Sequence, residues 1–221
     1  MTNIKSTQFV KTIDHTNLKP DATKTDIRTL CAQARQFNFA AVCVNPWHVA
    51  YAVQELAECT VAVAVVVGFP LGATTSSVKV FEAGEAVQSG AREIDLVINV
   101  AALKEREIHY IADEIKRVRA VVEGMMLKVI LETGLLELEE KKLAAQIAAD
   151  SGANILKTST GFFGGATVED VQLLKQMAPT LGVKASGGIR TAEFALQLLA
   201  AGATRLGTSS ACQIMAELDN K

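Results

Sequence analysis

The chain alternates between short runs of strand-forming residues and longer stretches with the apolar spacing of a helix, and this alternation restricts its fold more than any other feature. Several runs, such as 61–67 (VAVAVVV), are apolar at every position, which is typical of parallel strands covered on both faces. Eight strand-and-helix units within 221 residues predict a (β/α)8 barrel, the TIM barrel of the α/β class. The predicted strands are Thr12–Leu18, Ala41–Asn45, Val61–Gly68, Glu93–Val100, Leu127–Glu132, Ile155–Ser159, Val183–Ser186 and Arg205–Thr208.

The stretches between the predicted strands have helical signals on their faces and at their ends. Ile27, Leu30 and Ala34 recur at helical spacing, and Thr23 precedes Asp26 by the interval of a capping box. A doubly wound open sheet is the alternative architecture. Since no GxGxxG motif follows the first predicted strand and no Walker A motif occurs, the nucleotide-binding versions of that architecture are not favoured. Without a low-complexity linker, we expect one domain over residues 1–221.

Composition and charge exclude several classes of function. The chain has 22 Lys and Arg against 24 Asp and Glu, and a net charge of −2 provides no basic excess for binding nucleic acid. The apolar runs are too short to span a membrane, and the N-terminal segment lacks the apolar centre of a signal peptide. The four cysteines form no CxxC pair and are expected to be reduced, as in a cytoplasmic protein. They are Cys31, Cys43, Cys59 and Cys212.

Polar residues concentrate where the predicted strands end, which is the face of a barrel that carries function. Lys157 lies in NILKTST and Lys184 lies in GVKASGG, on two consecutive predicted strands. Because neighbouring strands are about 4.8 Å apart, the two amino groups are expected to meet. A second cation and partial desolvation both lower the pKa of a lysine, and the neutral amine can attack a carbonyl to form a Schiff base. The alternative for each lysine is a contact with solvent or a structural pair with a carboxylate.

Asp95 is a candidate partner for these lysines, because it stands inside the predicted strand EIDLVINV. It could neutralise a buried lysine, which is a structural role, or it could transfer protons in a Schiff-base mechanism. Asp14 and Cys43 stand near the ends of the first and second predicted strands and are candidates for the pocket wall. Core packing is the alternative for Cys43.

Two loops of small residues form a candidate anion-binding cradle. Gly187 and Gly188 follow the seventh predicted strand, and Ser209 and Ser210 follow the eighth and precede a helix. Glycine lets backbone N–H groups approach a ligand, a helix N-terminus favours negative charge, and barrels often bind phosphate at these two loops. Ordinary turn glycines and an N-cap serine are the alternative. The three histidines are widely separated, so no metal site is predicted.

The motifs of nearly the whole chain resemble, in order, those of the deoxyribose-phosphate aldolases, a family of class I aldolases on a (β/α)8 barrel. ILKTSTGF and VKASGGIRT are the most specific; the others are IDHTNLKP, AVCVNP, VVVGFPLGATT, EIDLVINVAALK, LKVILETG and RLGTSSA. The resemblance implies reversible cleavage of 2-deoxy-D-ribose 5-phosphate to D-glyceraldehyde 3-phosphate and acetaldehyde, in deoxyribose catabolism. It also implies a small-molecule substrate, no cofactor, no metal, and a homodimer or homotetramer, of which we expect the dimer.

The resemblance also assigns roles to the matching positions. Lys157 would form the Schiff base, and Lys184 and Asp95 would donate and accept protons. The residues that would hold the substrate phosphate are Thr160, Gly161, Gly187, Gly188, Ser209 and Ser210.

Three features depart from some members of that family. Phe162 stands where the longer enterobacterial type has a lysine, and Ala101 stands where the shorter bacterial branch often has glycine. The segment AELDNK lacks the tyrosine of the enterobacterial tail. Two other functions remain open. One is another Schiff-base barrel aldolase or transaldolase, and the other is a non-catalytic barrel that binds sugar phosphates.

Overall fold

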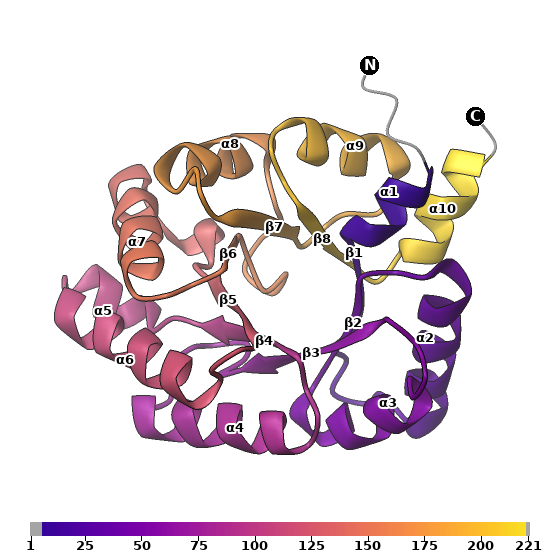
Figure 1. Ribbon diagram of the computed structural model, residues 1–221. Helices are drawn as coiled ribbons and strands as arrows, with labels where there is room; N and C mark the ends of the chain where they lie inside the picture. The colour runs from indigo at the N-terminus through magenta and orange to yellow at the C-terminus, as the bar shows by residue number, and fades with distance from the viewer. Residues whose placement is uncertain (1–5, 220–221) are drawn as a thin grey trace.

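Eight parallel strands close into a barrel in the computed structural model, which describes residues 6–219 (Figure 1). Each strand pairs with its neighbours in chain order, and β1 closes the ring by pairing with β8. The (β/α)8 barrel predicted from the sequence is confirmed; the last two residues of AELDNK lie outside the described residues. The strands are β1 (Ile13–Asn17), β2 (Ala41–Val44), β3 (Ala62–Val67), β4 (Glu93–Val97), β5 (Met126–Ile130), β6 (Ile155–Lys157), β7 (Gly182–Ser186) and β8 (Arg205–Thr208).

Helices surround the barrel and connect each strand to the next (Figure 1). In α2, Thr23 and Asp26 form the predicted capping box, and Asn38 ends the helix in the left-handed conformation. The predicted apolar face of this helix is buried against the barrel. The helices are α1 (Ser6–Phe9), α2 (Lys24–Phe37), α3 (Val49–Glu55), α4 (Ser76–Gln88), α5 (Val100–Lys104), α6 (Ile108–Val121), α7 (Leu138–Asp150), α8 (Val168–Met177), α9 (Ala192–Ala200) and α10 (Ala211–Asp219), with the 3-10 turns η1 (Val10–Thr12), η2 (Pro46–His48) and η3 (Thr133–Leu135).

Six of the eight strands end one to three residues earlier than predicted, and β4 and β6 are two of them. β4 ends at Val97, because the Asn99 side chain accepts a hydrogen bond from the Ala102 N–H and caps the start of α5. β6 ends at Lys157, two residues before the predicted end. The residues that follow Lys157 therefore belong to the loop that leads to α8.

The main apolar core lies between the strands and the helices, whereas the inside of the barrel is mixed. Side chains alternate along a strand, so Val63 and Val65 of β3 join the main core while Ala64 and Val66 face the interior. On β2 and β3 the interior side chains are small and apolar. The other strands contribute the buried charged residues Asp14, Glu93, Asp95, Lys128, Lys157, Lys184 and Arg205.

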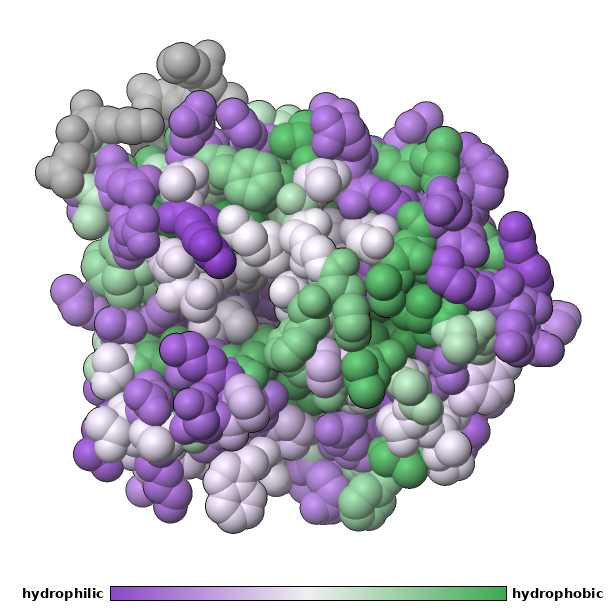
Figure 2. Space-filling view, turned by 180° about the vertical axis from the view of Figure 1, so that it is seen from behind, coloured by the Kyte–Doolittle hydropathy of each residue, from purple (hydrophilic) through white to green (hydrophobic). Residues whose placement is uncertain are grey.

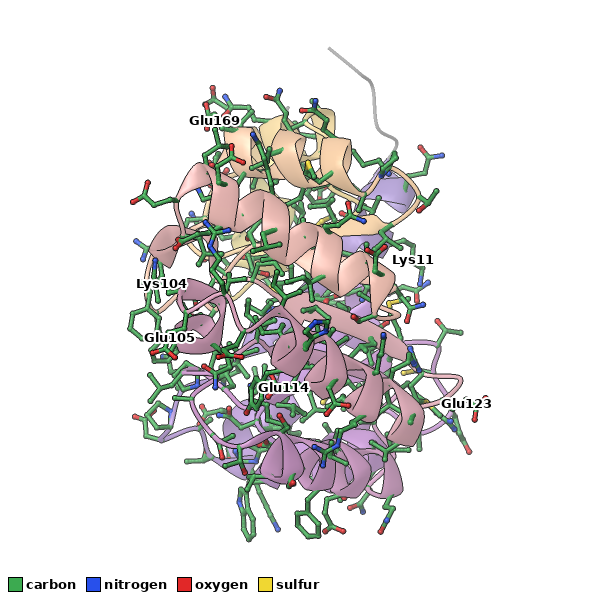
Figure 3. The ribbon with its side chains drawn as sticks, turned by 90° about the vertical axis from the view of Figure 1, so that its left-hand side faces the viewer. Lys11, Lys104, Glu105, Glu114, Glu123 and Glu169 are labelled. Atoms are coloured by element: carbon green, nitrogen blue, oxygen red, sulfur yellow. The ribbon has the colours of Figure 1, made fainter. Side chains whose placement is uncertain are left out.

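Charged side chains around the outer helices mostly point to solvent, as Glu105, Glu123 and Glu169 do (Figure 3). Glu114 of α6 is buried instead and pairs with Lys79 of α4 at 2.7 Å. Among the residues that the structure describes, no helix has the length and apolar character needed to cross a membrane.

Candidate active site

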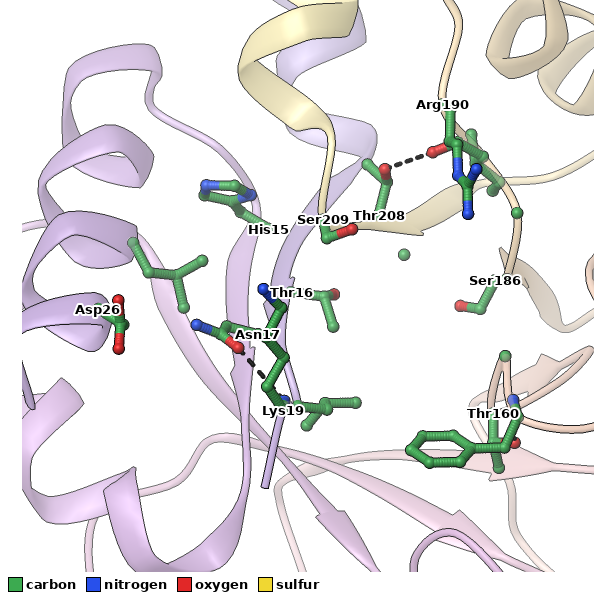
Figure 4. Close-up of a pocket in the computed structure, with 18 of the residues that line it drawn as sticks. His15, Thr16, Asn17, Lys19, Asp26, Thr160, Ser186, Arg190, Thr208 and Ser209 are labelled. Carbon is green, nitrogen blue, oxygen red and sulfur yellow. Dashed lines mark hydrogen bonds between the residues drawn. The ribbon is translucent and has the colours of Figure 1, made fainter. Parts of the chain in front are cut away.

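A pocket of about 570 Å³ opens where the carboxyl ends of β1, β6, β7 and β8 meet (Figure 4). The face opposite to that of Figure 1 shows a hollow near its centre, with hydrophobic side chains gathered along one side (Figure 2). The Lys157 side chain is 3% exposed and lines the floor of this pocket. Among the loop residues that surround it are Thr160, Gly161, Gly187, Gly188, Arg190 and Ser209.

Lys157 and Lys184 lie directly opposite each other on β6 and β7, and both are buried. Each Nζ atom donates to the same atom, Oδ2 of Asp95 on β4, at 2.8 Å from Lys157 and 2.7 Å from Lys184. One buried carboxylate thus joins the two lysines. The structure brings together the three residues for which the sequence suggested catalytic roles.

Further charged side chains extend this cluster deeper into the barrel. Lys128 of β5 donates to Oδ1 of Asp95 at 2.7 Å and lies 2.6 Å from Oε2 of Glu93. Asp14 of β1 lies 2.5 Å from the Nζ atom of the lysine on β7. Arg205 of β8 bonds to both Asp14 and Glu93. The result is one continuous network of ion pairs.

This network has one more cationic group than carboxylate groups when every member is ionised. Its four cationic side chains are those of Lys128, Lys157, Lys184 and Arg205, and its three carboxylates are those of Asp14, Glu93 and Asp95. A buried charge without a partner is costly, because the interior solvates it poorly. The positive and negative charges of the network are therefore equal in number when one lysine is neutral.

The surroundings favour Lys157 as the neutral amine. Burial lowers the pKa of Lys157, and although Asp95 opposes this effect, the net pKa stays below the usual value. Burial also disfavours the charged form of Lys184, but Asp14 and Asp95 outweigh burial and raise the pKa of Lys184. The expected lowering of a lysine pKa thus applies to Lys157 and not to Lys184, because Lys184 contacts two carboxylates.

The glycine loops after β6 and β7 pack closely and form one wall of the pocket. Gly187 and Gly188 have φ angles of 93° and 75°, which few residues other than glycine adopt. A Cβ atom on Gly187 would lie 2.9 Å from the Cα atom of Gly165 and 3.1 Å from that of Gly161. In the described part of the chain, the backbone N–H groups of Gly161, Gly187, Gly188 and Ser209 donate to no protein acceptor, so an anion could accept from them.

Comparison with known proteins connects this barrel and its pocket to one family. The model of the DeoC/LacD family aldolases matches residues 9–214. The chain belongs to this family of aldolases. It is 53% identical over 213 residues to the deoxyribose-phosphate aldolase of Thermococcus gammatolerans, with 94% of this chain and 95% of that protein covered. It is 48% identical over 211 residues to deoxyribose-phosphate aldolase 1 of Bacillus licheniformis, with 94% and 95% covered.

Solved structures show the same fold for this DeoC/LacD aldolase. A putative deoxyribose-phosphate aldolase from Coccidioides immitis has a TM-score of 0.96 and 39% identity, over 98% of this chain and 87% of that one. The tetrameric deoxyribose phosphate aldolase from Aeropyrum pernix has a TM-score of 0.91 and 31% identity, over 97% and 92% of the two chains.

Among the residues expected to hold phosphate in this aldolase, one already donates its hydrogen bonds to another side chain, and one lies outside the pocket lining. Thr160 lines the pocket, but its N–H and its hydroxyl both donate to the carboxylate of Glu132. Ser209 lines the pocket as expected. Ser210 is not part of the pocket lining; its N–H donates to Oγ1 of Thr208 at 2.9 Å, and α10 begins at the next residue. Phosphate binding by Ser210 stays a prediction.

Asp14 and Cys43 lie in the barrel interior beneath the pocket rather than in its wall, and both are fully buried. Sγ of Cys43 lies 3.9 Å from Oδ2 of Asp95, and burial raises the pKa of the thiol. With Ala64 and Val66, Cys43 forms the apolar side of the barrel interior of the aldolase. These residues belong to β2 and β3, which lie across the ring from β6 and β7. Small apolar groups therefore face the two lysines.

The sequence reasoning missed several residues of the charged network and of the pocket. Lys128, Glu93 and Arg205 are charged residues within apolar strands, and that placement was the available signal. Oγ of Ser186 is buried, lines the pocket and has no partner among the described residues, so it is available to a substrate hydroxyl. Arg190 extends into the mouth of the pocket from the loop after β7 (Figure 4). Its guanidinium group adds positive charge beside the glycine loops.

The histidines form no metal site in the described part of the aldolase. His15 bonds to Gln33 at 2.8 Å. Within residues 6–219, no group of three or more His, Cys, Asp or Glu side chains has an arrangement that could hold a metal ion.

Proposed function

We propose that this aldolase cleaves 2-deoxy-D-ribose 5-phosphate reversibly to D-glyceraldehyde 3-phosphate and acetaldehyde through a Schiff base on Lys157. The observation that carries the proposal is a lysine with a lowered pKa at the floor of an open pocket. The names of the relatives, which are deoxyribose-phosphate aldolases, support the choice of substrate. In this proposal the reaction needs only side chains of the barrel and water, and no cofactor.

The reaction begins when the neutral amine of Lys157 attacks the aldehyde carbon C1. The resulting carbinolamine loses water and forms a protonated imine, which attracts electrons from the C2–C3 bond. When the C3 hydroxyl loses its proton, the C2–C3 bond breaks and glyceraldehyde 3-phosphate leaves, while C1 and C2 remain on the lysine as an enamine. Protonation of C2 and hydrolysis of the imine then release acetaldehyde and restore Lys157.

Asp95 and Lys184 are placed to move the protons that these steps require. Oδ2 of Asp95 lies within hydrogen-bond distance of the Nζ atoms of both Lys157 and Lys184. A proton accepted by Asp95 can therefore pass to or from Lys184 within the buried cluster, or reach the substrate through one water molecule.

The charge of the buried network favours cleavage once the imine has formed. The network is balanced while Lys157 is neutral, and the protonated imine adds one positive charge to it. Conversion of the protonated imine to the enamine removes that charge. Because charge interactions are strong where water is excluded, the surplus positive charge helps to draw the electrons of the C2–C3 bond onto the imine.

The substrate phosphate is assigned to the other side of the pocket. Free backbone N–H groups of the glycine loops, the side chain of Arg190 and the start of α10 beside Ser209 all favour an anion there. The phosphate is remote from C1, so its binding energy can orient the aldehyde toward Lys157 without taking part in bond cleavage.

Borohydride trapping tests the proposed Schiff base directly. The protein is incubated with acetaldehyde and sodium borohydride, digested, and analysed by peptide mass spectrometry. We expect a reduced two-carbon adduct on Lys157, because burial lowers the pKa of its amine and the amine reaches the pocket. An adduct on Lys184 would contradict the roles assigned to the two lysines. Absence of any adduct in folded protein that binds deoxyribose 5-phosphate would favour the non-catalytic barrel, and a substrate panel would identify another aldolase.

We also propose that the aldolase is a homodimer of the cytoplasm. Four large apolar side chains are exposed on η2, on the loop before α4 and on α4 itself, and a second copy could cover them. These are Trp47, Leu71, Val78 and Phe81. The cysteines described in the structure are all free, which suits a reducing compartment. Light scattering of the purified protein distinguishes a dimer from a monomer or from a tetramer such as that of Aeropyrum pernix.

A further inference from the structure

Glu132 follows β5 and is buried beside the pocket, although no step of the proposed mechanism uses it. The residue is 1% exposed, and its φ of 59° places a residue other than glycine in the left-handed region. Both carboxylate oxygens accept from the Thr160 N–H at 3.2 Å. Oε2 also accepts from the Thr160 hydroxyl. Both hydrogen-bond donors of Thr160, its N–H and its hydroxyl, therefore donate to Glu132.

These contacts connect the end of β5 to the loop that leaves β6. The Thr133 N–H donates to the Thr158 carbonyl at 2.9 Å, so the two segments stay paired beyond the ends of their strands. Glu132 reaches from there to Thr160. The hydroxyl oxygen of Thr160 in turn accepts from the Phe162 N–H at 3.1 Å, which closes a turn. Glu132 thus fixes the turn 160–162 through its hydrogen bonds to Thr160.

The turn held by Glu132 forms part of the cradle assigned to the phosphate. Gly161 lies in the turn and packs against the loop after β7, since a Cβ atom on Gly187 would lie only 3.1 Å from the Cα atom of Gly161. A displacement of the turn therefore moves both glycine loops. Because the N–H and hydroxyl groups of Thr160 donate to Glu132, we assign Thr160 to fixing the turn and not to binding the phosphate.

We propose that Glu132 is a positioning residue that fixes the phosphate cradle and thereby determines how strongly the aldolase prefers a phosphorylated sugar to an unphosphorylated one. This inference rests on the proposed function, because it concerns the part of that site that recognises phosphate. A carboxylate can accept at both oxygens, so it can hold both donors of Thr160, which an amide cannot do equally well. Glu132 acts through Thr160 and touches no reacting atom.

The test compares kcat and KM for 2-deoxyribose 5-phosphate and for 2-deoxyribose in the wild type, Glu132→Asn and Glu132→Gln. Asparagine adopts the left-handed backbone readily, but its side chain is one CH2 group shorter. We expect Glu132→Asn to raise KM for the phosphate ester about tenfold or more, which corresponds to the loss of hydrogen bonds to a charged group. The kcat/KM for deoxyribose should change by less than about twofold, within the scatter of a neutral substitution. The KM of Glu132→Gln for the phosphate ester should lie between the values for the wild type and for Glu132→Asn.

A second pair of variants keeps the inference testable if a Glu132 variant unfolds. Thr160→Val removes the hydroxyl donor and should also raise KM for the phosphate ester selectively. Its combination with Glu132→Asn should be no worse than Glu132→Asn alone, because both remove the same contact. Glu139→Gln, at an exposed carboxylate of α7, is the matched control and should leave both substrates unaffected.

The outcomes separate this inference from the proposed function. Circular dichroism and borohydride trapping on Lys157 should be unchanged in the Glu132 and Thr160 variants, which would show that the fold and the nucleophile are intact. Equal losses with both sugars, or unchanged KM for the phosphate ester, would overturn the role of Glu132. A wild-type protein that cleaves neither sugar would instead reject the proposed function.

Discussion

Replacing Lys157 with leucine is expected to abolish cleavage of 2-deoxyribose 5-phosphate, with kcat lowered by at least about 10⁴-fold, as for loss of a catalytic nucleophile. Lys157 supplies the amine that forms the Schiff base, and its side chain lines the pocket. Lys128 and Lys184, the other lysines inside the barrel, are 0% exposed and lie in the network beneath it. They are therefore poorly placed to replace the missing amine.

The leucine variant is expected to stay folded, which makes the activity measurement meaningful. It removes the amine whose pKa is lowered and leaves three cations paired with three carboxylates in the buried network. Lys157→Arg is the matched variant, because it introduces a permanent charge without a nucleophilic amine. It should be both inactive and less stable in urea. Acetaldehyde release and urea unfolding are the measurements, and a leucine variant within tenfold of wild-type kcat, a difference of about 1.4 kcal/mol, would reject Lys157 as the nucleophile.

Replacing Asp95 with asparagine is expected to lower kcat by about 10²- to 10⁴-fold, the usual contribution of a positioned proton-transfer group. It should also lower the free energy of unfolding by about 3–5 kcal/mol, as for a broken buried ion pair. Burial favours the protonated form of Asp95, but Lys128, Lys157 and Lys184 outweigh burial and hold its pKa well below the usual value. The carboxylate is therefore ionised at neutral pH, and an amide cannot replace its charge.

The Asp95→Asn variant should also shift the pH dependence of its remaining activity. Asp95 raises the pKa of Lys157 against the effect of burial. Without this carboxylate the pKa of Lys157 falls further, so the amine stays neutral at lower pH and the acid limb of kcat/KM moves toward lower pH. Urea unfolding and a pH–rate profile test these changes. Asp113→Asn, at an exposed carboxylate of α6, is the control and should show neither change. Wild-type stability together with an unchanged acid limb in Asp95→Asn would contradict the role assigned to Asp95.

Much of the fold could be predicted because its signals are local. The capping box of Thr23 and Asp26 depends on residues three positions apart, and it forms as predicted. The last strand has the predicted bounds, Arg205–Thr208. The pairing of Lys157 with Lys184 could also be anticipated, because consecutive strands of a parallel barrel are neighbours. In each case a short stretch of sequence, or the order of two strands, was sufficient.

The charged network could not be predicted, because its ion pairs join residues that are far apart in the chain. Asp14 and Arg205 are 191 positions apart and meet only because β8 closes on β1. Lys128 stands in an apolar strand, where the sequence does not indicate which face is the barrel interior. The contact of Glu132 with Thr160 likewise depends on the shape of two loops.

Local patterns in the chain were enough to establish the order of strands and helices, the barrel, and the strand ends where its chemistry lies. They also placed two lysines together and suggested an amine nucleophile. Which lysine has the lowered pKa was decided only by the tertiary structure. A lysine pKa depends on how many carboxylates contact the amine once water is excluded. Among the described residues, closure of the barrel pairs Lys184 with both Asp14 and Asp95 but pairs Lys157 with Asp95 alone of these two carboxylates, and so leaves Lys157 as the more easily deprotonated amine.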